Sequence, residues 1–453
     1  MPLEAVGRRS GDQRVFENTT VRPITFLLIF AVLVPVIAAF GILYRRSLSV
    51  PYQDDYDTIL AFAVHYAQSP TLKAKLLEIA AEQHNEYKLG FEHSIVAAEL
   101  ELTHHLNFTF LTVLGDLFLL PLGYLLWRTN RQDEVGLDRR LLAFLPISVL
   151  FFSLTYWENL NWATTGLQNT PVILFSLLAI SLIAPGKTPS TAHLLLGCLA
   201  AALAAFTSAN GFLLGPVGLW ILLARRAYGG SVAWCASFVL PLAAYLYHFT
   251  PSVYVVQRFF YITRPLFFLG FIGCAVPFRW VAAPLGLVLM GIFVLAVRSR
   301  FDRANPVAFY FAVWIVATGC LVAWVRGGET FVIASRYSMY SSLMLIFCYS
   351  FLAQYLPGRW SIFNRTRFYV TSIVLAVCFC CLADVYAYKI LQTRRRSILA
   401  GIESYRANPQ VNSPLNNPEV EQGVPKEKAF EQGMLTEAIQ KGVYTLPPKQ
   451  EIH

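Results

Sequence analysis

The sequence has little charge for its length, and this excludes most soluble classes of protein. Only 14% of its 453 residues are charged and 56% are apolar, whereas soluble domains have roughly 25% and 45–50%. A soluble globular domain, a disordered chain and a DNA-binding domain are therefore excluded. We expect an all-α, polytopic integral membrane protein. Its net charge of +9 then reflects topology and contact with membrane lipids, not binding of nucleic acid.

Cysteine pairs and metal-binding spacings are also missing. All eight cysteines lie in apolar stretches and none lies in a predicted outside loop, so a disulfide framework is not expected. No H-E-x-x-H or similar spacing of metal ligands occurs in the chain. No cofactor is predicted with a motif of its own, and a divalent metal stays open as an alternative at Asp54 alone or together with His84 and Glu86.

Long apolar runs are what the sequence does contain. A membrane-spanning helix needs about 20 apolar residues to cross roughly 30 Å of hydrocarbon. Eleven runs approach that length and are predicted to span: 24–43, 108–127, 141–157, 169–184, 192–207, 211–224, 231–248, 281–297, 307–325, 337–356 and 368–386. The run 265–277 is too short to cross alone, so we expect it to be re-entrant or interfacial. The run 24–43 is too long for a cleavable signal and is predicted to be an anchor.

The distribution of basic residues predicts the orientation in the membrane. With a cytoplasmic N-terminus, short inside connections carry 17 Lys and Arg residues, and the longer outside loops carry 10, as the positive-inside rule requires. We therefore expect a multi-pass protein of the cytoplasmic (inner) membrane. Residues 1–386 form its transmembrane domain, and the polar tail, 387–453, is expected to be extracytoplasmic.

The first outside loop, 44–107, is the longest connection and the most polar. It holds nine acidic residues and five of the eight histidines. Its apolar residues recur at helical spacing, which predicts short amphipathic helices along the outer membrane surface. Loops of this length are usually functional or disordered, and the mixture of acids, amides and arginines on this side predicts one extracytoplasmic site.

At Pro51-Tyr52-Gln53-Asp54-Asp55-Tyr56-Asp57 the chain resembles the GT-C class of membrane glycosyltransferases. An acidic pair stands at the start of a long first outside loop, directly after the first span. Gln83-His84-Asn85-Glu86, Trp157-Glu158-Asn159 and Ser335-Arg336-Tyr337 also resemble motifs of bacterial membrane proteins of this type. The resemblance implies a GT-C-like fold and an enzyme that takes sugar from a polyprenyl-phosphate carrier at the extracytoplasmic face. The short tail differs from members with a large C-terminal domain, so a protein acceptor is not implied.

The resemblance maps the catalytic base of the class onto Asp54 or Asp55. Sugar transfer to a hydroxyl needs a base, and a neighbouring carboxylate raises the pKa of such a group. We assign Asp55 as the base, and Asp54 as the residue that orients the acceptor or holds a metal. His84 and Glu86 are predicted to contact the acceptor or a diphosphate. The alternative for all four is a solvated helix end.

Further binding residues are predicted at the outer ends of spans. Glu158 is an acid at membrane depth, which is costly unless it is paired or faces water, and Asn161 and Gln168 are candidates for sugar hydroxyls. The guanidinium of arginine forms bidentate hydrogen bonds with phosphate oxygens, so the outside arginines are candidates for binding the donor phosphate. Contact with lipid phosphates is their alternative. The candidates are Arg258, Arg326 and Arg336, with Tyr337 beside the last.

The sequence thus predicts a hexosyltransferase-like enzyme. Its partners are a lipid-linked sugar donor, a glycan or lipid acceptor and membrane lipids. Two other functions stay open. A transporter or flippase of lipid-linked saccharides would have polar residues distributed through its spans and an internal repeat. A non-catalytic subunit of envelope assembly would use the loop 44–107 to bind a partner.

Overall fold

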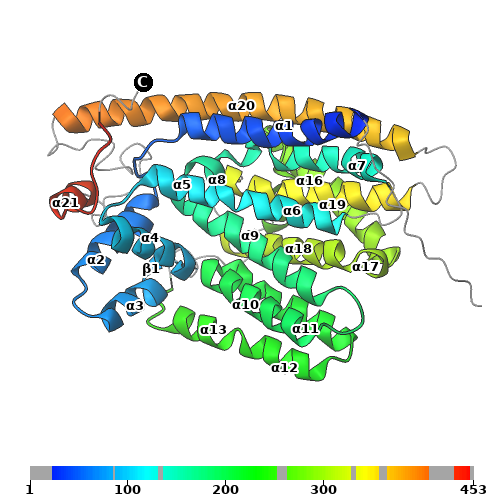
Figure 1. Ribbon diagram of the computed structural model, residues 1–453, viewed down its shortest axis with the longest axis horizontal. Coiled ribbons are helices and arrows are strands. Elements are labelled where there is room, and N and C mark those ends of the chain that lie inside the picture. Colours follow the sequence, from blue (N-terminus) through cyan, green and yellow to red (C-terminus); the bar gives the residue numbers. More distant parts are fainter. Residues whose placement is uncertain are drawn as a thin grey trace, which may run out of the picture.

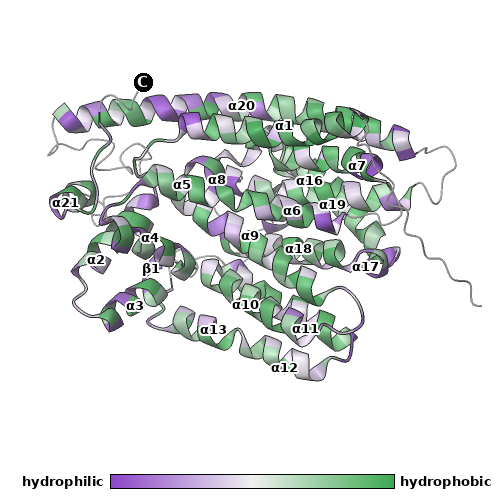
Figure 2. Cartoon of the chain, viewed as in Figure 1, coloured by the Kyte–Doolittle hydropathy of each residue, from purple (hydrophilic) through white to green (hydrophobic). Residues whose placement is uncertain are grey.

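The computed structural model describes residues 23–84, 87–130, 136–251, 263–327, 333–356, 365–407 and 433–448. Within these ranges nearly every element is a helix, and the one exception is a two-stranded hairpin. The long helices lie roughly parallel in a bundle (Figure 1), and most of their residues are hydrophobic (Figure 2). The prediction of an all-α, polytopic membrane protein is confirmed at this level.

Eight helices of the described chain are long and apolar enough to cross a membrane. They are α1 (Pro23–Arg46), α5–α6 (Phe108–Leu117, Leu119–Thr129), α7–α8 (Leu137–Phe151, Trp157–Asn161), α9 (Ala163–Ile183), α12–α13 (Tyr228–Ala236, Val239–Leu246), α16 (Arg279–Arg298), α18 (Pro306–Arg326) and α20 (Arg365–Ala407). The other three predicted spans also fall on helices: α10 (Thr191–Thr207), α11 (Leu214–Ala224) after a 3-10 turn at Ala209–Leu213, and α19 (Ser338–Tyr355).

The short apolar run 265–277 falls on α15 (Thr263–Gly273), which has 11 residues. It packs closely against α16. A Cβ atom on Gly286 would lie 1.8 Å from the carbonyl oxygen of Leu269, so only glycine allows the two backbones to approach this far. An α-helix of 11 residues is about 17 Å long, about half the hydrocarbon thickness. α15 is therefore too short to cross alone, as its sequence length indicates.

The two ends of the bundle differ. At one end the short helix α17 (Phe301–Ala304) is fixed by Asn305, which donates a hydrogen bond to the carbonyl of Thr129 (3.0 Å). This contact places the arginines around residue 300 at the same end as Arg128. The loop 44–107 lies at the opposite end of the bundle (Figure 1). That separation agrees with the positive-inside bias of the sequence.

The loop 44–107 is folded and has its own core. It contains a π-helix (Tyr56–Ala61), α2 (Phe62–Gln68), α3 (Leu72–Ala81) and α4 (Gly90–Thr103). Strands β1 (Gln83–His84) and β2 (Tyr87–Lys88) pair antiparallel. Thr71 caps α3 by accepting a hydrogen bond from the amide of Ala74 (3.2 Å), the role expected of a threonine before a helix. Ile59, Leu60 and Phe62 are fully buried.

The C-terminal tail packs on this loop. α20 continues beyond residue 386 to Ala407, and α21 (Met434–Gln440) lies beside α2 at the loop end of the bundle (Figure 1). The amide of Leu106 donates to the carbonyl of Val443 (2.8 Å), and the Tyr444 hydroxyl donates to the carbonyl of Ser49 (2.7 Å). Both ends of the loop are therefore tied to the tail.

Candidate functional site

A cavity of about 280 Å³, here called the loop-1 cavity, lies between the loop 44–107 and the helix ends beneath it. Segments far apart in the sequence form its wall: β1–β2, the start of α9, the turn after α10, the end of α18 and the start of α19. Six residues predicted from sequence as site residues line it together: Asp54, His84, Gln168, Arg326, Arg336 and Tyr337.

Asp54 presents a carboxylate to this cavity beside a histidine. Its side chain is 43% exposed, and its Oδ1 lies 3.9 Å from Nε2 of His84. The other ring nitrogen of His84, Nδ1, is hydrogen-bonded to Asp57. A histidine held at one nitrogen by a carboxylate has a fixed ring orientation. Asp57 therefore orients the ring of His84 so that its Nε2 faces Asp54.

Asp55, adjacent in sequence, faces the other way and is buried. Its Oδ1 accepts hydrogen bonds from the amide and the hydroxyl of Thr164 (2.9 and 2.7 Å), and its Oδ2 accepts from the amide of Tyr52 (3.0 Å). Thr164 is the second residue of α9, whose own N-cap residue, Trp162, makes no side-chain cap. Asp55 thus caps α9 from a distant segment. Burial raises the pKa of Asp55 to about 7 despite these hydrogen bonds.

Local backbone geometry explains why the two aspartates diverge. Gln53 has a φ of 45°, a left-handed conformation that is uncommon for residues other than glycine. A π-helix, a form that often occurs at functional sites, begins at Tyr56. Between these features the chain turns sharply, so Asp54 and Asp55 point to different sides.

Arg336 is the best-defined cation of the loop-1 cavity. Its backbone amide donates to Oε2 of Glu158 (2.8 Å). Its guanidinium lies 5.7 Å from the ring centre of Trp162 and 5.6 Å from that of Tyr337. Burial acts to lower the pKa of Arg336, but Tyr337, Glu158 and Asp54 together raise it above its ordinary value. The group is therefore a permanent positive charge, and Arg326 adds a second at the end of α18.

Uncharged polar groups complete the wall, and sequence reasoning selected Gln168 but not Asn169, Asn210 or Tyr340 as site residues. Asn210 donates from Nδ2 to the hydroxyl of Tyr340 (2.9 Å), and its buried Oδ1 has no hydrogen-bond partner among the described residues. Asn169 also lines the cavity, and Gln168 contacts Ser208 (3.4 Å). The only sequence signal for Asn210 is the polar run Thr207–Gly211 directly after an apolar stretch.

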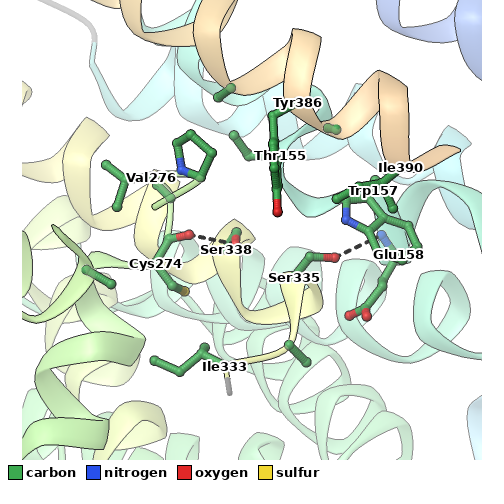
Figure 3. Close-up of a pocket in the computed structure, with 16 residues that line it drawn as sticks. Thr155, Trp157, Glu158, Cys274, Val276, Ile333, Ser335, Ser338, Tyr386 and Ile390 are labelled. Atoms are coloured by element: carbon green, nitrogen blue, oxygen red, sulfur yellow. Dashed lines mark hydrogen bonds between the residues drawn. The ribbon is translucent and has the colours of Figure 1, made fainter. Parts of the chain in front are cut away.

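Three predicted residues that the structure describes line other cavities, and two more lie outside the described residues. Glu158 lines a second cavity of about 210 Å³, here called the Glu158 cavity (Figure 3). Asn161 and Asp55 line a third, very small one. Glu86 and Arg258 lie outside the described residues.

The described residues include no group of three His, Cys, Asp or Glu side chains arranged to hold a metal ion. His84 lies between Asp54 and Asp57, and its Nδ1 is already hydrogen-bonded to Asp57.

No protein-family model, curated protein or solved structure matches this chain. The loop-1 cavity itself offers one accessible carboxylate, a histidine beside it, two arginines and several hydroxyl and amide groups.

Proposed function

We propose that the protein is a GT-C-like membrane glycosyltransferase of about eleven spans. It would move a sugar from a polyprenyl-phosphate-linked donor to an extracytoplasmic glycan or lipid acceptor. One observation carries the proposal: the carboxylate of Asp54 and the guanidinium groups of Arg326 and Arg336 line the same cavity. A transferase of this type needs a base and a phosphate-binding cation within one site.

In this proposal Asp54 is the base, in place of Asp55. The acceptor oxygen attacks C1 of the sugar, and its proton passes to Asp54 as the new carbon–oxygen bond forms. The bond between C1 and the phosphate oxygen breaks, and its electron pair leaves with the phosphate. A single displacement of this kind inverts the anomeric centre. Asp55 suits the role less well because its oxygens already hold Thr164 and Tyr52.

The arginines have a distinct part in the same step. Charge develops on the departing phosphate, and a fixed cation stabilises it most where water is scarce. Arg336 is held for this task by the hydrogen bond that its backbone amide donates to the carboxylate of Glu158 (2.8 Å) and by the rings of Trp162 and Tyr337. The side-chain amides of Asn169, Asn210 and Gln168 line the same cavity, where they can hydrogen-bond to sugar hydroxyls.

The side of the membrane follows from the two ends of the bundle. The loop-1 cavity lies at the end opposite Arg128 and Asn305. If the positive-inside rule holds for this chain, the cavity opens on the extracytoplasmic side. Lipid-linked sugar donors of the proposed class are used there.

Mass spectrometry of lipid-linked sugars and envelope glycans in a deletion strain tests the proposal. The strain is complemented with wild type, Asp54→Asn or Asp302→Asn, at matched expression. Asp302 is a matched aspartate in α17 at the far end of the bundle. We expect one sugar to be missing from a glycan and its lipid-linked donor to accumulate. Wild type and Asp302→Asn should restore the complete glycan and the normal donor level. Asp54→Asn should not, because its rate of transfer should fall by roughly 10²–10⁴-fold, the contribution of a general base.

Full restoration by Asp54→Asn would contradict the proposal. A transporter or an assembly subunit would then be favoured, and the two differ in the accumulated species. A flippase defect leaves the donor on the cytoplasmic leaflet. An assembly defect leaves donor levels unchanged.

A further inference from the structure

The third cavity, which we call the Arg394 cavity, lies on the opposite side of Asp55 from the loop-1 cavity. Its volume is about 10 Å³, which is room for about one water-sized atom. Three arginines from two helices line it: Arg46 at the end of α1, and Arg394 and Arg395 on α20. Asp55 is the only acidic residue among its described lining residues, so positive charge is in excess there.

Arg394 is the residue that could bind an anion in this cavity. Its side chain is only 8% exposed, and its Nε and Nη1 have no hydrogen-bond partner among the described residues. Its guanidinium stacks 3.7 Å from the ring centre of Tyr52 and 5.6 Å from that of Trp157. Buried donors without partners are costly, and most for a charged group. Aromatic stacking leaves the edge of the guanidinium, with its N–H groups, available to an anion.

The depth of the cavity in the membrane indicates which anions reach it. The apolar run of α20 ends near residue 386, so Arg394 lies about 12 Å further along the helix at 1.5 Å per residue. Side chains lean toward the helix N-terminus, which brings the guanidinium back toward the bilayer. Arg46 lies only three residues beyond the apolar run 24–43. Both groups are thus near the level of lipid headgroups, where basic pockets between helices bind phosphates.

We propose that the Arg394 cavity binds one phosphate group of an anionic membrane lipid. The small volume admits a single phosphate oxygen, which would accept hydrogen bonds from Nε and Nη1 of Arg394. The remaining oxygens would stay at the mouth, near Arg46 and Arg395. This site is separate from the proposed donor site, because Arg326 and Arg336 line the loop-1 cavity and none of these three arginines does.

Occupation of the site would also steady the start of the loop 44–107. Arg394 stacks on Tyr52, and the amide of Tyr52 donates to Asp55. A phosphate that fixes Arg394 therefore fixes the segment that carries Asp54. Lipid binding requires no sugar transfer, so its measurement is independent of the proposed function.

Native mass spectrometry and thermal unfolding of the delipidated full-length protein test the site. The probes are dioctanoyl phosphatidylglycerol, inorganic phosphate at matched ionic strength, and dioctanoylglycerol, which has no phosphate. We expect one copy of the phosphatidylglycerol to bind and to raise the melting temperature. Arg394→Gln should weaken this binding by at least about tenfold, the loss expected when a charged hydrogen bond is removed.

Arg396→Gln is the matched control, because Arg396 is on the same helix, is exposed and does not line the cavity. It should bind as wild type does. Arg395→Gln, a partly exposed lining residue, serves as the second variant if Arg394→Gln fails to fold, and it should also weaken binding. If inorganic phosphate alone saturates the Arg394 cavity, free phosphate and not a lipid headgroup is the ligand. Equal binding by Arg394→Gln or Arg395→Gln and wild type, or by dioctanoylglycerol, would overturn the proposal.

Discussion

The loop-1 cavity and the Glu158 cavity are similar in size but very different in charge. Their volumes are about 280 and 210 Å³. The first is lined by Asp54, Arg326 and Arg336, whereas Glu158 is the only charged residue among the described residues lining the second. Both volumes are large enough for a small ligand, so volume alone does not separate the two cavities. Charges of both signs facing one space distinguish the loop-1 cavity as the place where chemistry can occur.

Glu158 links the two cavities and shows how one supports the other. Its carboxylate accepts from the amide of Arg336 (2.8 Å), and its amide contacts the Ser335 hydroxyl (3.3 Å). In Figure 3 Tyr386 of α20 points from above toward Ser335 and Ser338. The carboxylate of Glu158 therefore serves to hold the segment that presents Arg336. The Glu158 cavity lies behind that segment.

The largest effect should come from removing a charge of the loop-1 cavity. Arg336→Gln deletes the cation assigned to the leaving phosphate, so we expect sugar transfer to fall by about 10²-fold. Arg336→Lys should retain more activity because it keeps the charge but loses the paired geometry of the guanidinium. Rates are measured with purified protein and a lipid-linked donor. A full rate for Arg336→Gln would remove the distinction between the cavities.

A smaller effect is expected at the residue between the cavities. Glu158→Ala removes the acceptor for the Arg336 amide, and transfer should fall by roughly tenfold. Glu158→Gln keeps an acceptor oxygen and should recover most of that loss. If Glu158→Ala reduces the rate more than Arg336→Gln does, the carboxylate has a direct part in the reaction.

A carboxyl group that lines neither of these two cavities should affect stability more than rate. In the folded protein the pKa of Asp55 is raised from 3.8 to about 7, so between these values the folded state binds a proton that the unfolded state has lost. Stability from this group is present at low pH and is lost as the pH rises toward 7. Asp55→Asn should flatten that dependence, so the change in melting temperature between pH 4 and pH 7 should shrink by on the order of 5 °C. The rate of sugar transfer should change by less than about threefold. An unchanged pH profile of melting would contradict this.

The smallest effect is expected inside the Glu158 cavity. Tyr386→Phe removes a hydroxyl that lines this space and leaves the ring in place, so transfer should stay within about twofold of wild type. The same assay serves, with Arg336→Gln as the sensitive reference. A loss comparable to that of Arg336→Gln would assign substrate binding to this cavity as well.

The helices could be predicted from the sequence because each depends on a local apolar run. All eleven predicted spans fall on helices, and α15 is as short as its run indicates. The different orientations of Asp54 and Asp55 could not be predicted, because they depend on the φ of Gln53 and on Thr164, more than a hundred residues away.

Other residues that line or support the loop-1 cavity could not be identified from the sequence for a similar reason. Asn169 and Tyr340 lie within apolar helices, where sequence alone does not show which face is inward. Asp57 resembles an ordinary acid in a first helical turn, and only the β1–β2 hairpin brings His84 to it. The outside arginines at span ends were predicted as a group, and Arg326 and Arg336 of that group line the loop-1 cavity. The arginines of the Arg394 cavity were not among the predicted site residues.

α20 has a mechanical consequence that follows from its length. Its 43 residues form a rod of about 65 Å, roughly twice the hydrocarbon thickness of a bilayer. One half is embedded beside α1 and α7, and the other half carries the guanidinium that stacks on Tyr52. A continuous helix transmits rotation from one end to the other. Because Arg394 stacks on Tyr52, a change in the inclination of this rod, which bilayer thickness influences, would displace the segment that holds Asp54.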